Sequence, residues 1–105
     1  MSPDLLRGHT DTIILGLLLE DDKYCFDICN MIHDLTDGEY RPKESTVYSC
    51  CKRLETKDYI SSHWGDGQSG RRRYYHIEDK GRTLFEQNKL DWIFTNEILY
   101  KLLRG

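Results

Sequence analysis

The residues whose types could do chemistry gather between Lys43 and Arg73. The first group combines hydroxyl and cationic side chains: Lys43, Ser45, Thr46, Tyr48, Ser49, Lys52 and Arg53. The second group is a run of three arginines, Arg71, Arg72 and Arg73. Such side chains donate hydrogen bonds to base edges and to phosphate oxygens. We therefore expect these two groups together to form a binding surface for double-stranded DNA.

The stretch from Lys43 to Ile77 predicts the elements that position these residues. A helix is expected over residues 45–57, with Ser45 as its N-cap. Two strands are expected over residues 59–64 and 72–77, and the glycines between them permit the positive φ angles of a tight turn. A polar helix beside a hairpin with an arginine-rich tip is typical of a winged helix-turn-helix. The helix alone also fits an ordinary solvated surface, and the hairpin favours DNA binding.

Three further helices are expected in the rest of the chain. Residues 4–19 and 24–36 show helical periodicity. Residues 79–103 predict a helix about 36 Å long, which exceeds the width of a 100-residue domain, about 26 Å. We therefore expect a mainly α fold with a small β-hairpin. Residues 1–78 would form the winged helix-turn-helix, and residues 79–105 would form a projecting dimerisation helix.

The predicted C-terminal helix carries apolar residues on more than one side. Phe85, Trp92 and Leu99 recur every seven residues, and Ile98 and Leu102 lie on a neighbouring line. A helix with two apolar sides needs two partners, and the simplest second partner is the same helix of another copy. These five residues are therefore the expected interface of a homodimer.

Trp92 has two alternative roles in this interface. It fits an aromatic packing residue of the dimer core, or a platform on which a flat ligand stacks at the two-fold axis. Phe85, Lys89 and Asn96 lie within two turns of Trp92 on nearly the same side of the helix. These four residues are the predicted binding site for a planar hydrophobic small molecule.

Charge is unevenly distributed along the chain of 105 residues. The net charge of −3 argues against non-specific binding to nucleic acid or to an anionic membrane. Between residues 41 and 73, however, eight lysines and arginines occur with only four acidic residues, which makes the local basic patch that DNA docking requires. No apolar run approaches the roughly 20 residues of a membrane span, and the pattern of a signal peptide is missing. No membrane partner is expected, and the default compartment is the cytoplasm.

Catalytic and metal-binding patterns are not evident in the sequence. It has no paired carboxylates, phosphate-binding loop or nucleophile elbow, so we expect neither enzyme activity nor a cofactor. The four cysteines, Cys25, Cys29, Cys50 and Cys51, lack the spacing of a zinc site. Buried thiols are the simplest interpretation, and a redox or metal site is the alternative. The four histidines likewise show no ligand spacing, so no metal site is expected.

The sequence resembles the PadR family of bacterial transcriptional regulators over about residues 8–94. The resemblance rests on Ser45-Thr46-Val47-Tyr48, on Lys52-Arg53-Leu54-Glu55, and on Gly70–Tyr75 ahead of Gly81. It implies a winged helix that represses genes for detoxification or efflux. It also implies DNA contacts from Thr46, Tyr48, Lys52 and the wing arginines. The chain is similar to the short multidrug-sensing members, in which a tryptophan matching Trp92 stacks flat hydrophobic compounds between two subunits.

Two functions from different classes fit the sequence. The first is a homodimeric, ligand-responsive repressor whose recognition helices enter major grooves about 34–36 Å apart on a palindromic operator. The second is a winged-helix interaction module that does not read DNA, which the acidic net charge favours. Binding to the region upstream of the protein's own gene separates them, because a DNA reader loses affinity steeply as the salt concentration rises.

Overall fold

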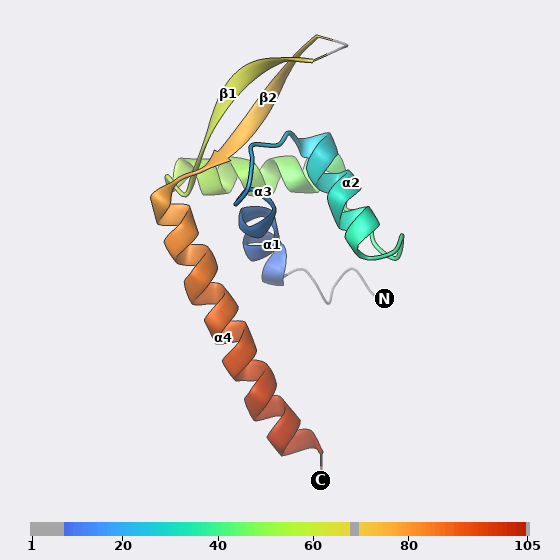
Figure 1. Ribbon diagram of the computed structural model, residues 1–105, viewed down its shortest axis with the longest axis vertical. Helices are drawn as coiled ribbons and strands as arrows, with labels where there is room; N and C mark the ends of the chain where they lie inside the picture. Colours follow the sequence, from blue (N-terminus) through green and yellow to red (C-terminus); the bar gives the residue numbers. More distant parts are fainter. Residues whose placement is uncertain (1–7, 68–69, 105) are drawn as a thin grey trace.

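The computed structural model describes residues 8–67 and 70–104 and confirms the predicted fold class. Along the chain its elements are α1 (Thr10–Leu17), α2 (Cys25–Leu35), α3 (Glu44–Thr56), β1 (Ile60–Gly67), β2 (Gly70–Ile77) and α4 (Asp79–Leu103). The two strands pair into an antiparallel hairpin at one end of the molecule, and α4 extends from the body toward the other end (Figure 1). We call this hairpin the wing.

The first helix is shorter than the sequence predicts. α1 begins at Thr10 and ends at Leu17, whereas the prediction spans residues 4–19; positions 4–7 lie outside the described residues. Lys23 accounts for the end of the helix, because its buried ammonium group donates a hydrogen bond to the carbonyl oxygen of Leu17 at 2.7 Å. An α-helix leaves its last carbonyl groups without backbone partners, so Lys23 caps α1 from the following turn.

The start of α3 also differs from the prediction, in which Ser45 is the N-cap. The N-cap is Lys43, whose ψ of 144° is extended and whose side chain makes no capping hydrogen bond. Pro42 precedes it and ends the extended segment, and Glu44 is the first helical residue. A carboxylate in the first turn interacts favourably with the positive end of the helix dipole. Ser45 is therefore a helical residue with an exposed side chain.

The wing is longer than predicted. Its register pairs Ile60 with Ile77, Trp64 with Arg73, and Gly67 with Gly70, so the segment 65–67 belongs to β1 and not to the turn. The connecting positions 68 and 69 lie outside the described residues. Gly65 suits a strand here because the Tyr74 ring lies where its side chain would be: a Cβ on Gly65 would approach that ring to 2.6 Å.

The hydrophobic core lies between the first three helices and the base of the wing. Each element contributes fully or almost fully buried side chains: Ile14, Leu15 and Leu18; Ile28, Cys29 and Ile32; Val47, Cys50, Cys51 and Leu54; and Ile60, Tyr75 and Ile77. The α3 set repeats at helical spacing, so one side of α3 is buried and the other is left to solvent. Backbone hydrogen bonds between Lys23 and Tyr75, at 2.8 and 3.2 Å, also join the α1–α2 connection to β2.

The C-terminal helix has the predicted bounds and extends beyond the body of the molecule. Its 25 residues correspond to about 37 Å of helix, and the whole molecule measures 56 × 30 × 21 Å. Near its start α4 packs on α1, where Phe85 lies against Gly16 and the Asn88 side chain donates a hydrogen bond to Thr12 at 3.0 Å. Within residues 8–67 and 70–104, no helix has the length and apolar character needed to cross a membrane.

Candidate nucleic-acid interface

The solvent-exposed side of α3 carries most of the polar residues that the sequence predicts to bind DNA. Ser45, Tyr48, Ser49 and Lys52 lie on it at helical spacing, and we call these four residues the α3 face. Tyr48 is 44% exposed although it is a large aromatic residue, and the Lys52 ammonium group lies 5.8 Å from the centre of its ring. Lys43 and Thr46, at the start of the helix, are exposed as well. The α3 face therefore offers hydroxyl, phenol and ammonium groups to a partner.

One margin of the α3 face is anchored to α1. The guanidinium group of Arg53 donates a hydrogen bond to the Asp11 carboxylate at 2.5 Å, and the Cys50 thiol donates one to the same oxygen at 2.7 Å. The sequence predicts Arg53 to be a DNA-binding residue, and the structure gives its guanidinium group an intramolecular carboxylate partner. Arg53 therefore fixes α3 against α1.

The opposite margin is anchored to the wing. Glu55 lies one helical turn after Lys52, and its carboxylate accepts hydrogen bonds from Arg73 at 3.2 and 3.4 Å and from Ser62 at 2.5 Å. Arg73 also donates to the Ser62 hydroxyl at 2.9 Å, so the three side chains form a closed network. This network holds β1 and β2 at a fixed position relative to the α3 face.

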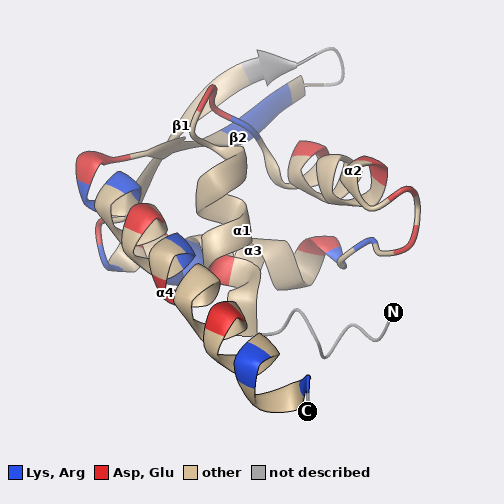
Figure 2. Ribbon diagram, turned by 60° about the horizontal axis from the view of Figure 1, so that its bottom comes forward, with Lys and Arg blue, Asp and Glu red and all other residues tan. Residues whose placement is uncertain are grey.

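Strand alternation divides the three wing arginines between two faces. Arg71 and Arg73 lie on the face that carries Ser62 and contacts α3, and their guanidinium carbons are 5.3 and 5.9 Å from the centre of the Trp64 ring. Arg72 lies on the other face, where it stacks on the Tyr24 ring at 4.5 Å and donates a hydrogen bond to the Tyr24 hydroxyl at 3.0 Å. Two of the three arginines therefore lie on the face of the wing that contacts α3. Figure 2 shows this basic part of β2 in blue.

Trp64 does not occupy the position that the sequence suggests. Its place at the end of the predicted strand suggests a packing residue that covers the base of the wing. The structure places it well beyond the core, opposite Arg73 in the register, with 57% of its surface exposed. Sequence reasoning missed this residue as a candidate for the binding surface, because alternation predicts the face of a strand and not how far the core extends along it.

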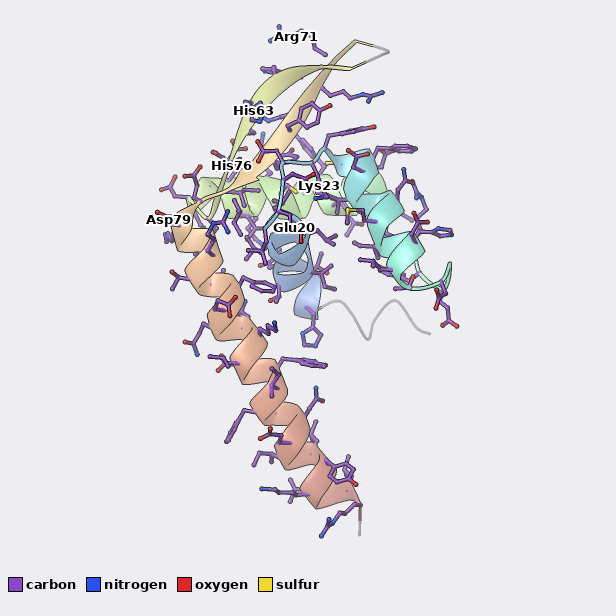
Figure 3. All side chains as sticks on the ribbon, viewed as in Figure 1. Glu20, Lys23, His63, Arg71, His76 and Asp79 are labelled. Atoms are coloured by element: carbon purple, nitrogen blue, oxygen red, sulfur yellow. The ribbon has the colours of Figure 1, made fainter. Side chains whose placement is uncertain are left out.

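The other face of the wing is attached to the α1–α2 connection through Asp22. One carboxylate oxygen accepts a hydrogen bond from His76 at 2.7 Å, and the other accepts one from His63 at 2.8 Å. Figure 3 labels the two histidines on the wing. Burial raises the pKa of Asp22, but the hydrogen bonds from the two histidines outweigh this effect and hold the pKa below its usual value. Among the residues that the structure describes, no group of histidine, cysteine and acidic side chains has the geometry of a metal site.

A groove lies between α1 and α4, on a different part of the molecule from the α3 face. It has a volume of about 640 Å³, and Ile13, Gly16, Phe85, Lys89 and Trp92 are among the residues that line it. Three of the four predicted ligand-binding residues, Phe85, Lys89 and Trp92, are thus brought together. The fourth, Asn96, lines a separate shallow depression farther along α4. We call the first of these the α1–α4 groove.

The distal half of α4 exposes a long series of apolar side chains. Four of the five predicted dimerisation residues belong to it, and their exposed fractions are 53% for Trp92, 38% for Ile98, 44% for Leu99 and 72% for Leu102. Leu90, Phe94 and Leu103 add to this surface, with exposed fractions of 61%, 64% and 78%. Phe85 differs, because it is half-buried against α1.

Comparison with known proteins decides the family. The model of the transcriptional regulator PadR-like family matches residues 14–87, which include the buried part of α1, the α3 face, the wing and the start of α4. The chain belongs to the PadR-like family. The family consists of transcriptional regulators and not of enzymes, in agreement with the absence of a catalytic pattern from the sequence.

Individual PadR-like and related proteins support this assignment. An uncharacterized Lysinibacillus sphaericus protein is 36% identical over 103 residues, which cover 97% of this chain and 94% of that protein. The structure of a transcriptional regulator from Clostridium thermocellum is 39% identical, with a TM-score of 0.89 and coverage of 99% of both chains. Bacillus subtilis PadR in complex with operator DNA is 22% identical, with a TM-score of 0.68 over 84% of this chain and 48% of that one, and this likeness shows a shared fold.

The cysteines of this PadR-like chain occupy the interior side of α2 and α3. Burial raises the pKa of the Cys50 thiol to about 12, and burial also raises the pKa of Cys29. A hydrogen bond with Cys25 is the main cause of a raised pKa at Cys51, and the same bond lowers the pKa of the half-buried Cys25. All four are free thiols. Their positions agree with the interpretation as buried thiols for Cys29, Cys50 and Cys51.

Proposed function

We propose that this PadR-like regulator binds double-stranded operator DNA through the α3 face together with the side of the wing that faces α3. The observation that carries the proposal is the exposed row from Ser45 to Lys52, which lies between two anchored margins. Asp11 holds one margin through Arg53, and Glu55 holds the wing at the other. A binding surface on rigid elements is already ordered before it meets DNA, so complex formation costs less conformational entropy.

The predicted DNA-binding residues then divide into three roles. In this proposal Lys52 and the hydroxyl groups of the α3 face reach base edges in a major groove, and Lys43 and Arg71 contact phosphate. Arg53 and Arg73 already have carboxylate partners, and Arg72 lies against Tyr24 on the other face. These three arginines hold α3 and the wing in position. The operator DNA bound by the Bacillus subtilis PadR structure, which shares this fold, supports the proposal.

A salt titration tests DNA binding. The protein is titrated against a duplex from the region upstream of its own gene and against a shuffled duplex of equal length, by fluorescence anisotropy. We expect a linear fall of the logarithm of affinity with the logarithm of salt concentration, and a preference for the upstream duplex of roughly a thousandfold. Equal and weak binding to both duplexes would instead support the interaction module that does not read DNA.

We further propose that two copies associate through α4, with residues up to 78 as the DNA-binding part and residues 79–105 as the dimerisation part. The apolar surface of the distal half of α4 supports this, since a lone helix with such a surface is unfavourable in water. We expect Leu99→Glu to shift the protein toward a monomer in sedimentation experiments. Leu35→Glu is the control, because Leu35 is 69% exposed at the end of α2, far from this surface. A Leu99→Glu protein that stays dimeric would contradict the assignment.

The α1–α4 groove is the proposed binding site for a small-molecule effector. Its volume and the exposed ring of Trp92 suit a planar hydrophobic compound. A cationic compound would gain attraction to the Trp92 ring. In a Trp64→Phe background, Trp92 is the single tryptophan, and we expect its emission to be quenched as planar cationic dyes are added. An unchanged spectrum across many dyes would assign Trp92 to packing between subunits.

We propose that the protein represses detoxification or efflux genes and that binding of an effector relieves this repression. An effector bound between α1 and α4 changes operator affinity only if it binds the two dimer conformations unequally. A compound that quenches Trp92 should therefore weaken binding to the upstream duplex. A compound that binds in the groove and leaves operator affinity unchanged would contradict this regulatory role.

A further inference from the structure

Trp64 is a large apolar side chain in an unusual place. It lies on β1 toward the tip of the wing, and 57% of its surface is exposed. An exposed indole contributes little to the free energy of folding, since the hydrophobic effect depends on the area removed from water. Its neighbours are two cationic groups, the guanidinium groups of Arg71 and Arg73 at 5.3 and 5.9 Å. The side chain is therefore more simply explained by a binding partner than by the fold.

The position of Trp64 relative to α3 is fixed by the network around Glu55. Trp64 pairs with Arg73 across the two strands, and Arg73 donates hydrogen bonds to the carboxylate of Glu55 on α3. Tyr48, Lys52 and Glu55 follow one another along α3 at intervals of four and three residues, so they share one side of the helix. A continuous row of side chains thus leads from the α3 face across Glu55 and Arg73 to the indole.

The chemistry around the indole favours one kind of partner. The guanidinium group of Arg71 offers positive charge for phosphate, and the Trp64 ring beside it offers an apolar surface for deoxyribose and base edges. Arginines enter narrow minor grooves of duplex DNA, and apolar side chains of DNA-binding proteins contact or wedge into base steps from the same groove. Because the wing follows α3 along the chain and contacts it through Glu55 and Arg73, a duplex bound at the α3 face would also lie near the wing.

We propose that Trp64 contacts duplex DNA directly as the aromatic residue of the wing, with Arg71 beside it and with Glu55 as the positioning residue that fixes Arg73. This inference rests on the proposed DNA-binding function and adds a specific contact to it. Trp64 supplies the apolar part of the contact at the minor-groove edge. Glu55 removes the free positive charge of Arg73 and thereby limits non-specific attraction by the wing.

The test uses Trp64 as its own reporter. The chain has two tryptophans, so Trp92→Phe leaves Trp64 as the single tryptophan, whose emission is excited selectively at long wavelength. The full-length variant is titrated with the upstream duplex, and Trp64 emission and its quenching by acrylamide are followed beside anisotropy of the labelled duplex. We expect the emission to change and acrylamide access to fall, with the same midpoint as the anisotropy. In the protein with Trp92 intact, Trp64→Ala should weaken binding about tenfold, because the buried apolar surface of the indole is lost, and Trp64→Phe should retain most of the affinity.

The outcomes separate this inference from the function on which it rests. Duplex binding with unchanged Trp64 emission and full affinity of Trp64→Ala would overturn the Trp64 contact and leave the proposed function intact. Failure of the wild-type protein to bind duplex DNA would overturn both. If Trp64→Ala does not fold, the Trp92→Phe titration still decides, because it leaves Trp64 in place. Glu55→Gln should raise affinity for the shuffled duplex, and no such rise would exclude the proposed role of Glu55.

Discussion

Glu55 on α3 and Arg73 on β2 join the two elements that carry the candidate DNA surface, at distances of 3.2 and 3.4 Å between carboxylate and guanidinium groups. The residues are 18 positions apart, and Ser62 on the paired strand completes the network. Because both side chains are partly buried, the pair fixes the orientation of the wing more than an exposed ion pair would. The base of the wing is therefore attached to α3 by side-chain contacts as well as by the chain itself.

Removing either partner of this connection should destabilise the fold. We expect Glu55→Ala to lower the free energy of unfolding by about 1 kcal/mol, and Arg73→Ala to add little to it, because both changes break one network. Urea unfolding of the two single variants and the double variant gives this coupling. Glu86→Ala, an exposed glutamate on α4, is the control. Additive losses in the double variant would show that the two residues act independently.

Gly81 should not tolerate even the smallest side chain. It is buried in the first turn of α4, and an added Cβ would overlap the carbonyl oxygen of Tyr59 and lie 2.9 Å from Ile77. Alanine is ordinarily the better helix former by about 1 kcal/mol, but a clash with backbone outweighs this gain. We expect Gly81→Ala to lower the free energy of unfolding by about 1–3 kcal/mol.

The matched control for this substitution is Thr83→Ala, at an exposed position two residues along α4. Thermal or urea unfolding of both variants should show a loss for Gly81→Ala and little change for Thr83→Ala. A Gly81→Ala protein as stable as the wild type would mean that α4 can move away from the wing base without cost.

The attachment of the wing to Asp22 should make stability depend on pH in the acid range. The folded-state pKa of Asp22 is lowered below its usual value of 3.8. A carboxyl group whose pKa is lower in the folded state stabilises the fold at pH values above its unfolded-state pKa. This stabilisation is lost as the pH falls through the folded-state pKa. We therefore expect the stability difference between wild type and Asp22→Asn to be largest near neutral pH and to shrink below about pH 4.

Urea unfolding at a series of pH values measures this difference. Asp34→Asn is the control, because the Asp34 side chain is 80% exposed and lies on α2 away from the wing. A stability difference for Asp22→Asn that stays constant down to the lowest pH would show that its hydrogen bonds to His63 and His76 do not favour the ionised carboxylate.

The sequence predicts most of the fold because the long elements have strong local signals. The bounds of α4 at Asp79 and Leu103 and the buried stripe of α3 follow from helical periodicity over many residues. The end of α1 and the N-cap of α3 differ from the prediction, because Lys23 caps α1 at Leu17 through a contact made only in the folded chain, and α3 begins at Glu44 with Lys43 as its N-cap. The length of the wing was underestimated because Gly65 and Gly67 signal a turn in isolation.

The candidate site could be predicted only in part. The residue types on the α3 face are evident from the sequence, and strict alternation could have shown that Arg72 faces away from Arg71 and Arg73. The partners of Arg53 and Arg73 could not be predicted, because Asp11 and Glu55 meet them only after α1 and the wing pack on α3. Asn96 was grouped with Trp92 by helical spacing, but the direction of a helix face relative to α1 depends on tertiary packing.

The central claim is that the α3 face reads duplex DNA, and Lys52 is its most direct test. Lys52→Gln removes one cation from the middle of this face, whereas Lys101→Gln removes one from the distal end of α4. The measurement is affinity for the upstream duplex as a function of salt concentration. Because Lys52 is proposed to reach base edges, we expect Lys52→Gln to weaken binding by at least about tenfold across the salt range, with Lys101→Gln equal to wild type. Equal affinity of Lys52→Gln and wild type across this range would contradict the account.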